Sequence, residues 1–184
     1  YHKLAPMLIA ITGANGEYPK RVNASGGLYV EKDEREIPDM FLLNADYPSE
    51  FTVMMVSTLT NDTQLENRIY GKYGTMQLDD TPVLRANGDF TEEFKAKNGG
   101  NSEAKIETNS NRDQENNFID VVRSRKLADL YGPIDEGHIS SALCHLGGMS
   151  HQLGRAASPG ELLERTKGNA PLAEAYGRMQ EHLL

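Results

Sequence analysis

Short runs of β-branched and aromatic residues, separated by turn residues, occupy the chain from residue 19 to residue 86. They predict six strands, near residues 21–29, 40–47, 51–60, 67–73, 75–78 and 82–86. Apolar and mixed positions alternate most clearly over residues 51–57, which is typical of a strand with one buried face. The links between the runs are short, so we expect neighbouring strands to be antiparallel. Because no helical pattern alternates with the strands, a doubly wound parallel sheet is disfavoured.

Helical patterns stand on both sides of this strand-rich region. Residues 2–12 are apolar on nearly every face, which predicts a helix packed on several sides that Pro6 starts or kinks. Residues 91–111 are polar and predict an exposed connection. Helical spacing returns over residues 112–126, with Phe118, Val121 and Val122 as a buried stripe. It continues over 135–153, with Asp135 as the N-cap, and over 159–167 and 171–184.

This order of elements predicts a single α+β domain over residues 1–184. We expect a largely antiparallel open sheet of about six strands, with helices packed on one face and further helices at the C-terminus. A buried helix that begins at residue 2 leaves no room for an N-cap or for a preceding element to pack against it. We therefore expect the chain to begin inside a larger fold.

Composition argues against several classes of partner. The 184 residues include 19 Lys and Arg against 27 Asp and Glu, a net charge of −8. No stretch interleaves basic with aromatic residues, so we expect no nucleic-acid partner. The longest apolar run, residues 4–11, is about half of the roughly 20 residues that cross a bilayer, so we expect no membrane partner. The single cysteine, Cys144, cannot form an internal disulfide, which fits a reducing compartment, and we expect the cytoplasm.

Four histidines and the cysteine are the first candidates for chemistry. His138 and His145 are seven residues apart, about 10 Å along a helix at a rise of roughly 1.5 Å per residue, which is too far for two ligands of one metal. Cys144 and His151 have the same spacing. We interpret the two histidines as boundary residues and Cys144 as a small buried hydrophobe. His2 is different because it opens the first helix, where its imidazole is either solvated or faces what an upstream chain contributes.

Glycine and acidic motifs carry less chemistry. The Gly13–Gly16 segment, GANG, follows a helix and precedes a strand, the reverse of a dinucleotide-binding loop. The Gly71–Gly74 segment, GKYG, lacks the spacing of a phosphate-binding loop and predicts a hairpin or bulge. Gly147 and Gly148 stand inside a helical pattern at a cost of about 1 kcal/mol each, which a close approach of another backbone would justify. Residues 31–36 read as a charged, solvated turn.

Several motifs resemble one enzyme family. Residues 117–126 (NFIDVVRSRK) and 135–147 (DEGHISSALCHLG) look like the late part of bacterial Gfo/Idh/MocA-type oxidoreductases, relatives of glucose-fructose oxidoreductase and inositol dehydrogenase. Residues 2–6 (HKLAP) resemble the helix that opens the second domain of these enzymes, and residues 69–75 (IYGKYGT) resemble a recurrent strand turn. The resemblance spans most of residues 1–153, and the tail from about residue 155 to 184 has no match.

The resemblance implies a function that this chain does not carry alone. Such enzymes bind NAD or NADP in an N-terminal Rossmann domain, which also holds a catalytic lysine in a Glu-Lys-Pro motif. This chain has neither Glu-Lys-Pro nor Gly-x-Gly-x-x-Gly, so we expect it to be the C-terminal substrate and oligomerisation domain, with no cofactor bound. By the same resemblance the catalytic histidine is His2. The substrate would be a sugar or polyol, and a homo-oligomer is expected.

Two other interpretations stay open. Besides a part of a sugar or polyol dehydrogenase, the chain is a part of an NAD-dependent glycoside hydrolase in the first, and a stand-alone binding and oligomerisation module without activity in the second. A strand, a Gly-x-Gly-x-x-Gly loop and a Glu-Lys-Pro upstream of Tyr1 would favour the enzymes, and a native start codon near Tyr1 would favour the module.

Overall fold

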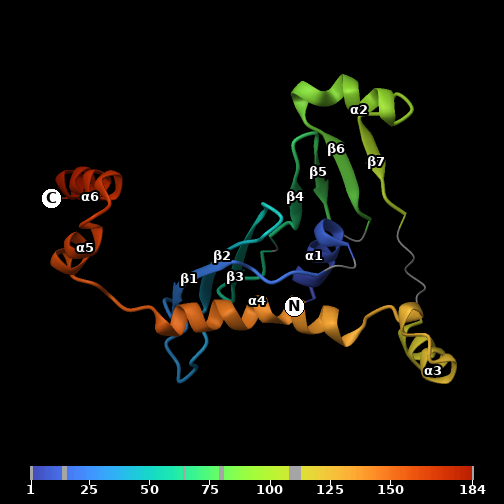
Figure 1. The fold of residues 1–184 in the computed structure, drawn as a ribbon, viewed down its shortest axis with the longest axis horizontal. Helices are drawn as coiled ribbons and strands as arrows, with labels where there is room; N and C mark the ends of the chain where they lie inside the picture. The colour runs from blue at the N-terminus through green and yellow to red at the C-terminus, as the bar shows by residue number, and fades with distance from the viewer. Residues whose placement is uncertain (1, 14–15, 64, 79–80, 108–112, 184) are drawn as a thin grey trace. The chain divides into compact units, whose positions relative to one another are not determined.

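The computed structural model describes residues 2–13, 16–63, 65–78, 81–107 and 113–183, the side chain of residue 183 excepted. Two compact units make up the chain, Tyr1–His151 and Gln152–Leu184. The first unit holds two antiparallel sheets and most of the helices, and the second is a pair of helices (Figure 1). The α+β class is therefore confirmed, whereas a single sheet of about six strands is wrong: the described residues form a sheet of three strands and a sheet of four.

The three-stranded sheet consists of β1 (Arg21–Gly27), β2 (Met40–Asp46) and β3 (Thr52–Thr58), in that order. Both pairs are antiparallel, as the short connections predict. Leu43 lies between Ala24 on β1 and Met55 on β3, and these three residues belong to the face that carries the core. The alternation that predicts the strands therefore also assigns their buried face.

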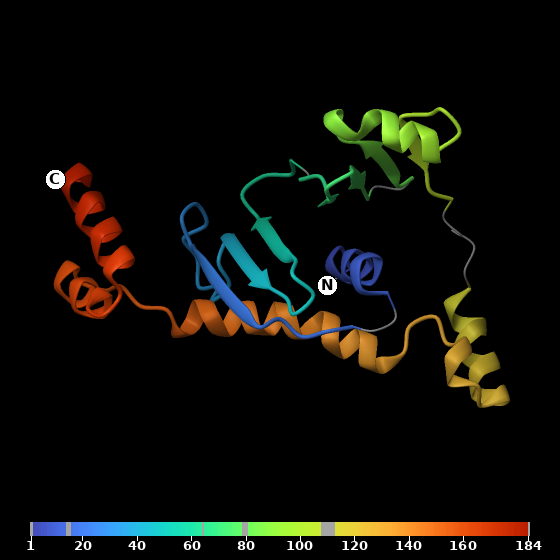
Figure 2. The same ribbon diagram turned by 45° about the horizontal axis from the view of Figure 1, so that its top comes forward.

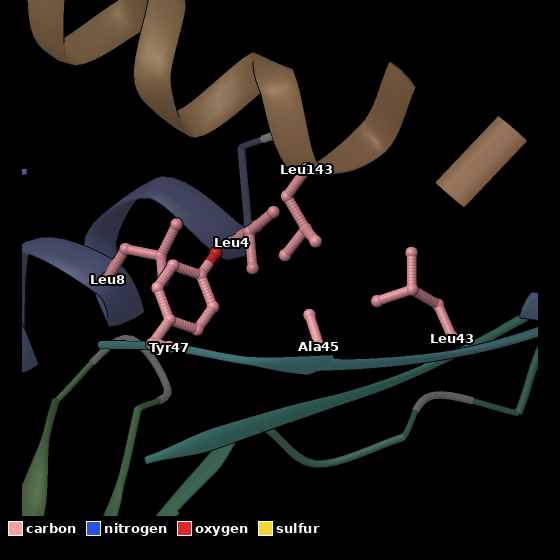
Figure 3. Close-up of a cluster of buried hydrophobic side chains, with 6 residues drawn as sticks. All are labelled: Leu4, Leu8, Leu43, Ala45, Tyr47 and Leu143. Atoms are coloured by element: carbon pink, nitrogen blue, oxygen red, sulfur yellow. The ribbon is translucent and has the colours of Figure 1, made fainter. Parts of the chain in front are cut away.

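Two helices pack on this face of the sheet. Helix α1 (Leu4–Thr12) contributes Leu4 and Leu8, and α4 (Ile134–Leu153) contributes Leu143. With residues of β2 and its end they form one cluster of buried side chains, drawn in Figure 3: Leu4, Leu8, Leu43, Ala45, Tyr47 and Leu143. Helix α4 runs along the three strands (Figures 1 and 2). It is tied to β1 by a hydrogen bond from the Ala24 amide to the Ser150 hydroxyl, at 3.1 Å.

Two details of the helix predictions need correction. Helix α1 is packed on one side only, because Ile9 and Ile11 remain 45% and 39% exposed. Its all-round apolar sequence is therefore not matched by all-round burial within the described residues. Asp135 lies in the first turn of α4 and is not its N-cap, since the helix begins one residue earlier. There its carboxylate still complements the positive end of the helix dipole.

The four-stranded sheet consists of β4 (Arg68–Tyr70), β5 (Gly74–Gln77), β6 (Val83–Ala86) and β7 (Glu103–Lys105), all antiparallel and in that order. A 3-10 turn, η1 (Gly88–Phe90), and helix α2 (Thr91–Lys97) stand between β6 and β7. The connection predicted over residues 91–111 is exposed as expected, since none of its described residues is buried, but it forms a helix and a strand. Residues 108–111 lie outside the described residues. Ion pairs one turn apart, Glu92 with Lys95 and Glu93 with Lys97, support α2 without any buried residue.

Helix α3 (Gln114–Ser124) is followed by the short turn η2 (Leu127–Asp129). Asp113 caps α3 by accepting a hydrogen bond from the Asn116 amide at 2.9 Å. Of the predicted buried stripe only Val121 is buried, whereas Phe118 and Val122 are 59% and 44% exposed. The three residues have helical spacing as predicted, but among the described residues few side chains cover Phe118 and Val122.

The second unit contains α5 (Pro159–Thr166) and α6 (Ala170–Leu183), close to the predicted bounds. A capping box formed by Ser158 and Glu161 starts α5, with Pro159 in the first helical turn. The Tyr176 hydroxyl donates a hydrogen bond to the Pro159 carbonyl at 3.0 Å and so joins the two helices. In the described part of the chain, no helix combines the length and apolar character that a bilayer crossing requires.

Candidate functional site

His2, the predicted catalytic residue, lies in the turn that leads into α1, and its side chain is exposed. Leu4, two residues later, is 6% exposed and belongs to the buried cluster, as does Leu8 one turn further on. These two anchors fix the start of α1 against the sheet, so the backbone at His2 is held close to a rigid layer. Its catalytic role stays a prediction.

The same end of the layer holds two buried polar atoms. The hydroxyl of Tyr47 points toward Leu4 (Figure 3), and the Tyr47 side chain is 3% exposed. Neither this hydroxyl nor Oε1 of Glu17 has a hydrogen-bond partner among the described residues. The other carboxylate oxygen of Glu17 accepts a hydrogen bond from the Ser49 hydroxyl at 3.2 Å. Buried polar atoms usually have hydrogen-bond partners, so the two unpartnered oxygens make this end of the core unusual.

Burial raises the pKa of Tyr47 to about 12, with smaller contributions from the Glu17 carboxylate and the Cys144 thiol. The phenol is therefore protonated at every physiological pH. It is available as a hydrogen-bond donor and is not a base at neutral pH. The ring is fixed by stacking on Phe51, with ring centroids 4.4 Å apart and planes inclined by 9°.

Asp39 is a second buried polar group, and it is fully satisfied. It is 0% exposed and accepts hydrogen bonds from the amides of Tyr29, Val30 and Glu31 at 2.7 to 3.1 Å. Burial alone would raise the pKa of Asp39, but the three amides outweigh it and the pKa is lowered. The long connection between β1 and β2 is thus tied to one carboxylate.

The other histidines and the cysteine make separate local contacts. His138 meets the Tyr18 ring edge to face at 6.1 Å, and His145 is exposed. His151 shares a hydrogen bond of 3.1 Å with the Gly26 carbonyl and lies against the Phe41 ring. Cys144, predicted to be buried, is partly buried and packs against the buried cluster. Among the described residues no group of three or more His, Cys, Asp or Glu is arranged to hold a metal ion.

The glycine motifs are structural, as the spacing predicts. Gly71 donates its amide to the Gly74 carbonyl at 2.9 Å and closes the hairpin between β4 and β5. A Cβ on Gly147 would lie 2.2 Å from Cδ1 of Leu43, so this glycine allows α4 to approach β2 closely. The neighbour that demands glycine is thus a side chain and not a backbone. Residues 14–15 of the GANG segment lie outside the described residues.

Sequence reasoning missed Asp39 and Tyr47. Asp39 follows Pro38 immediately before a strand, and only its loop amides reveal its role. In the sequence Tyr47 resembles an ordinary strand residue, because the groups near its buried hydroxyl, Glu17 and Leu4 at the start of α1, are distant in sequence.

A dinucleotide cradle is not formed by these residues. Every strand pair among the described residues is antiparallel, whereas the dinucleotide fold needs parallel strands joined by a helix. The chain also has no Gly-x-Gly-x-x-Gly. No step of a hydride transfer is therefore assigned to it.

Comparison with protein-family models gives no match, and no curated protein matches either. Solved structures do match. A putative oxidoreductase from Thermotoga maritima aligns with a TM-score of 0.55 over 82% of this chain and 43% of its own length, at 13% identity. UDP-N-acetylglucosamine 3-dehydrogenase GnnA from Acidithiobacillus ferrooxidans gives 0.52 over 80% and 45%, at 13% identity. An NAD-binding protein from Listeria innocua gives 0.52 over 84% and 49%, at 15% identity.

The shared fold is an α+β arrangement found in oxidoreductases. The chain spans less than half of the length of each of these proteins. At such identities the likeness concerns the fold, and the function needs a separate argument.

Proposed function

We propose that this chain is the C-terminal domain of an NAD(P)-dependent oxidoreductase of the Gfo/Idh/MocA type that acts on a sugar or polyol. The observation that carries the proposal is the likeness in fold of at least 80% of the chain to just under half of a dehydrogenase, a putative oxidoreductase and an NAD-binding protein. The motifs at residues 117–126 and 135–147 support it independently, because their sequences resemble the late part of these enzymes. The cofactor, NAD or NADP, belongs to a Rossmann domain outside these residues.

In this proposal His2 accepts or returns the proton of the substrate hydroxyl. An imidazole is the side chain that most often serves as a general acid or base in enzymes. The end of the layer is suited to hold it, since Leu4 and Leu8 anchor the helix that follows. The same substrate handling serves an NAD-dependent glycoside hydrolase, the alternative within the family.

A non-catalytic binding and oligomerisation module is the alternative from another class. The outer face of the three-stranded sheet favours an oligomer in either case. Leu42, Met54 and Val56 belong to this face and are 41%, 75% and 37% exposed. Sedimentation at high concentration tests this part: a Met54→Asp variant is expected to shift an oligomer toward monomer, and a wild-type chain that is only monomeric contradicts it.

The decisive experiment compares the 184-residue chain with the longer polypeptide that the proposal requires, in which a Rossmann domain precedes these residues. Calorimetry is expected to show no NAD(H) binding by the 184 residues, whereas the longer polypeptide binds it and oxidises a sugar or polyol. In the longer polypeptide, His2→Gln is expected to lower kcat by about 100-fold or more. His145 is an exposed histidine on α4, and His145→Gln is expected to leave kcat unchanged. Micromolar NAD(H) binding by the short chain, or equal kcat for both variants, overturns the proposal.

A further inference from the structure

The four-stranded sheet has one apolar and one polar face. Ile69, Met76, Leu84 and Ala104 form a row across the four strands on the first face. On the other face, the register places Tyr70, Thr75, Arg85 and Glu103 in a row, with Arg68 and Gln77 beside it. The polar face is not flat, because it contains a hollow of about 280 Å³.

The lining of this hollow is rich in hydrogen-bond donors. It consists of Arg68, Tyr70, Thr75, Gln77, Arg85, Ala86 and Asn87. Two arginines thus line it, and among the described residues no carboxylate does. The whole chain carries a net charge of −8, so two arginines in one lining are a local exception. Guanidinium groups recognise carboxylate and phosphate oxygens with paired hydrogen bonds.

Arg85 is oriented by neighbours on both sides. Its Nε donates to Glu103 at 2.9 Å, and its Nη1 donates to Oε1 of Gln77 at 2.9 Å. Its remaining nitrogen, Nη2, has no hydrogen-bond partner among the described residues. The side chain is nevertheless 53% exposed, so a ligand can reach it. The guanidinium is therefore held in place with donor capacity to spare.

Arg68 stands at the other side of the hollow. It pairs with Glu66 and its side chain is 41% exposed. The hydrogen bonds to Glu66 and then to Tyr70 raise the pKa of Arg68, so it is charged at every physiological pH. Glu66 and Glu103 hold the two arginines from outside the hollow, because neither carboxylate belongs to its lining.

Asn87, another lining residue, is held by three hydrogen bonds. Its side-chain Nδ2 donates to the carbonyls of Gly71 and Lys72 at 2.7 and 2.9 Å, and its Oδ1 accepts from the Thr75 hydroxyl at 3.2 Å. The hairpin between β4 and β5 is thereby tied to the end of β6. A preformed site binds with a smaller loss of conformational entropy than a mobile one.

We propose that this hollow binds an oxyanion, a phosphate or carboxylate group of a small polar molecule, between Arg68 and Arg85. The unused Nη2 of Arg85 favours a ligand that is rich in acceptors. A neutral sugar offers as many donors as acceptors and matches such a lining less well. The inference does not rest on the proposed function, because oxyanion binding needs neither NAD(P) nor His2.

The test is a two-dimensional amide NMR titration of the 184-residue chain at constant ionic strength. The probes are inorganic phosphate, succinate, glucose 6-phosphate and glucose. We expect saturable shifts confined to amides of β4, β5 and β6 with the anions, and none with glucose. Tighter binding of glucose 6-phosphate or of succinate identifies the phosphate or the carboxylate as the natural group. Shifts spread over the whole surface, or equal binding of glucose, overturn the proposal.

Variants separate the hollow from general charge attraction. Arg85→Gln is expected to raise the phosphate Kd at least tenfold. Arg85→Lys keeps the charge and loses the paired donors of the guanidinium, so its phosphate Kd is expected to lie between those of Arg85→Gln and the wild type. Arg21→Gln is the matched control, since Arg21 pairs with Asp46 on the three-stranded sheet. Equal effects of the changes at 21 and 85 contradict the proposal. Unchanged amide shifts of β4, which is not adjacent to β6, in the free Arg85→Lys variant show that the sheet is intact.

Discussion

Two adjacent glycines in α4 have very different surroundings. A Cβ on Gly147 would lie 2.2 Å from Cδ1 of Leu43 and 3.4 Å from Cζ of Phe41, whereas a Cβ on Gly148 meets nothing within 4 Å. Leu43 is 1% exposed at the centre of the core, so its methyl group has little space into which to move. Substituting each glycine by alanine isolates the close contact between helix and sheet.

The expected magnitudes follow from two terms. Alanine favours a helix interior over glycine by about 1 kcal/mol, and this gain is the same at both positions. Overpacking at Gly147 costs about 1 to 3 kcal/mol, because Leu43 or the helix must shift. Gly148→Ala is therefore expected to stabilise the protein by about 1 kcal/mol. Gly147→Ala is expected to be less stable than Gly148→Ala by the overpacking cost of about 1 to 3 kcal/mol.

Urea unfolding followed by circular dichroism measures this difference. At a slope of about 2 kcal/mol per molar urea, the midpoints of the two variants are expected to differ by about 0.5 to 1.5 M. Comparing the two variants with each other removes the propensity term, and only the contact with Leu43 remains.

A double substitution tests the cause. In a Leu43→Ala background the offending methyl group is absent, so Gly147→Ala is expected to stabilise as Gly148→Ala does. The reasoning is refuted if Gly147→Ala is as stable as Gly148→Ala in the wild-type background. It is also refuted if the penalty persists when Leu43 is alanine.

Three further predictions concern the same layer. Leu143→Ala, at a side chain that is 0% exposed, is expected to lower the free energy of unfolding by about 2 to 5 kcal/mol in urea, and a loss below 1 kcal/mol contradicts the assigned core. Asp39 has a lowered pKa, so its contribution to stability is complete above its unfolded pKa of about 3.9 and is lost as the pH falls toward the folded value. Urea midpoints measured from pH 7 to pH 2 are expected to fall less steeply for Asp39→Asn than for the wild type, and parallel curves contradict the role of Asp39. Tyr47→Phe removes a buried hydroxyl without a partner and is expected to stabilise the 184-residue chain by about 1 kcal/mol, whereas a destabilised variant shows that the hydroxyl is paired.

The positions of six strands could be predicted because each has a local signature. The strand expected at residues 51–60 is β3, Thr52–Thr58, and its alternation is visible without any partner. The pairing of the strands, in contrast, has no local signature in the sequence. β3 and β4 follow each other in the chain but belong to separate sheets, and no local pattern near residues 59–67 records this. The expectation of one continuous sheet fails for that reason.

The seventh strand could not be predicted from its own residues. β7 has three residues, of which only Ala104 is apolar, so alternation gives no signal. It exists because the exposed edge of β6 offers backbone partners and because Glu103 meets Arg85 across the pair. The proposed oxyanion site could not be predicted from the sequence either. Its lining comes from three strands, and only their pairing brings these residues together.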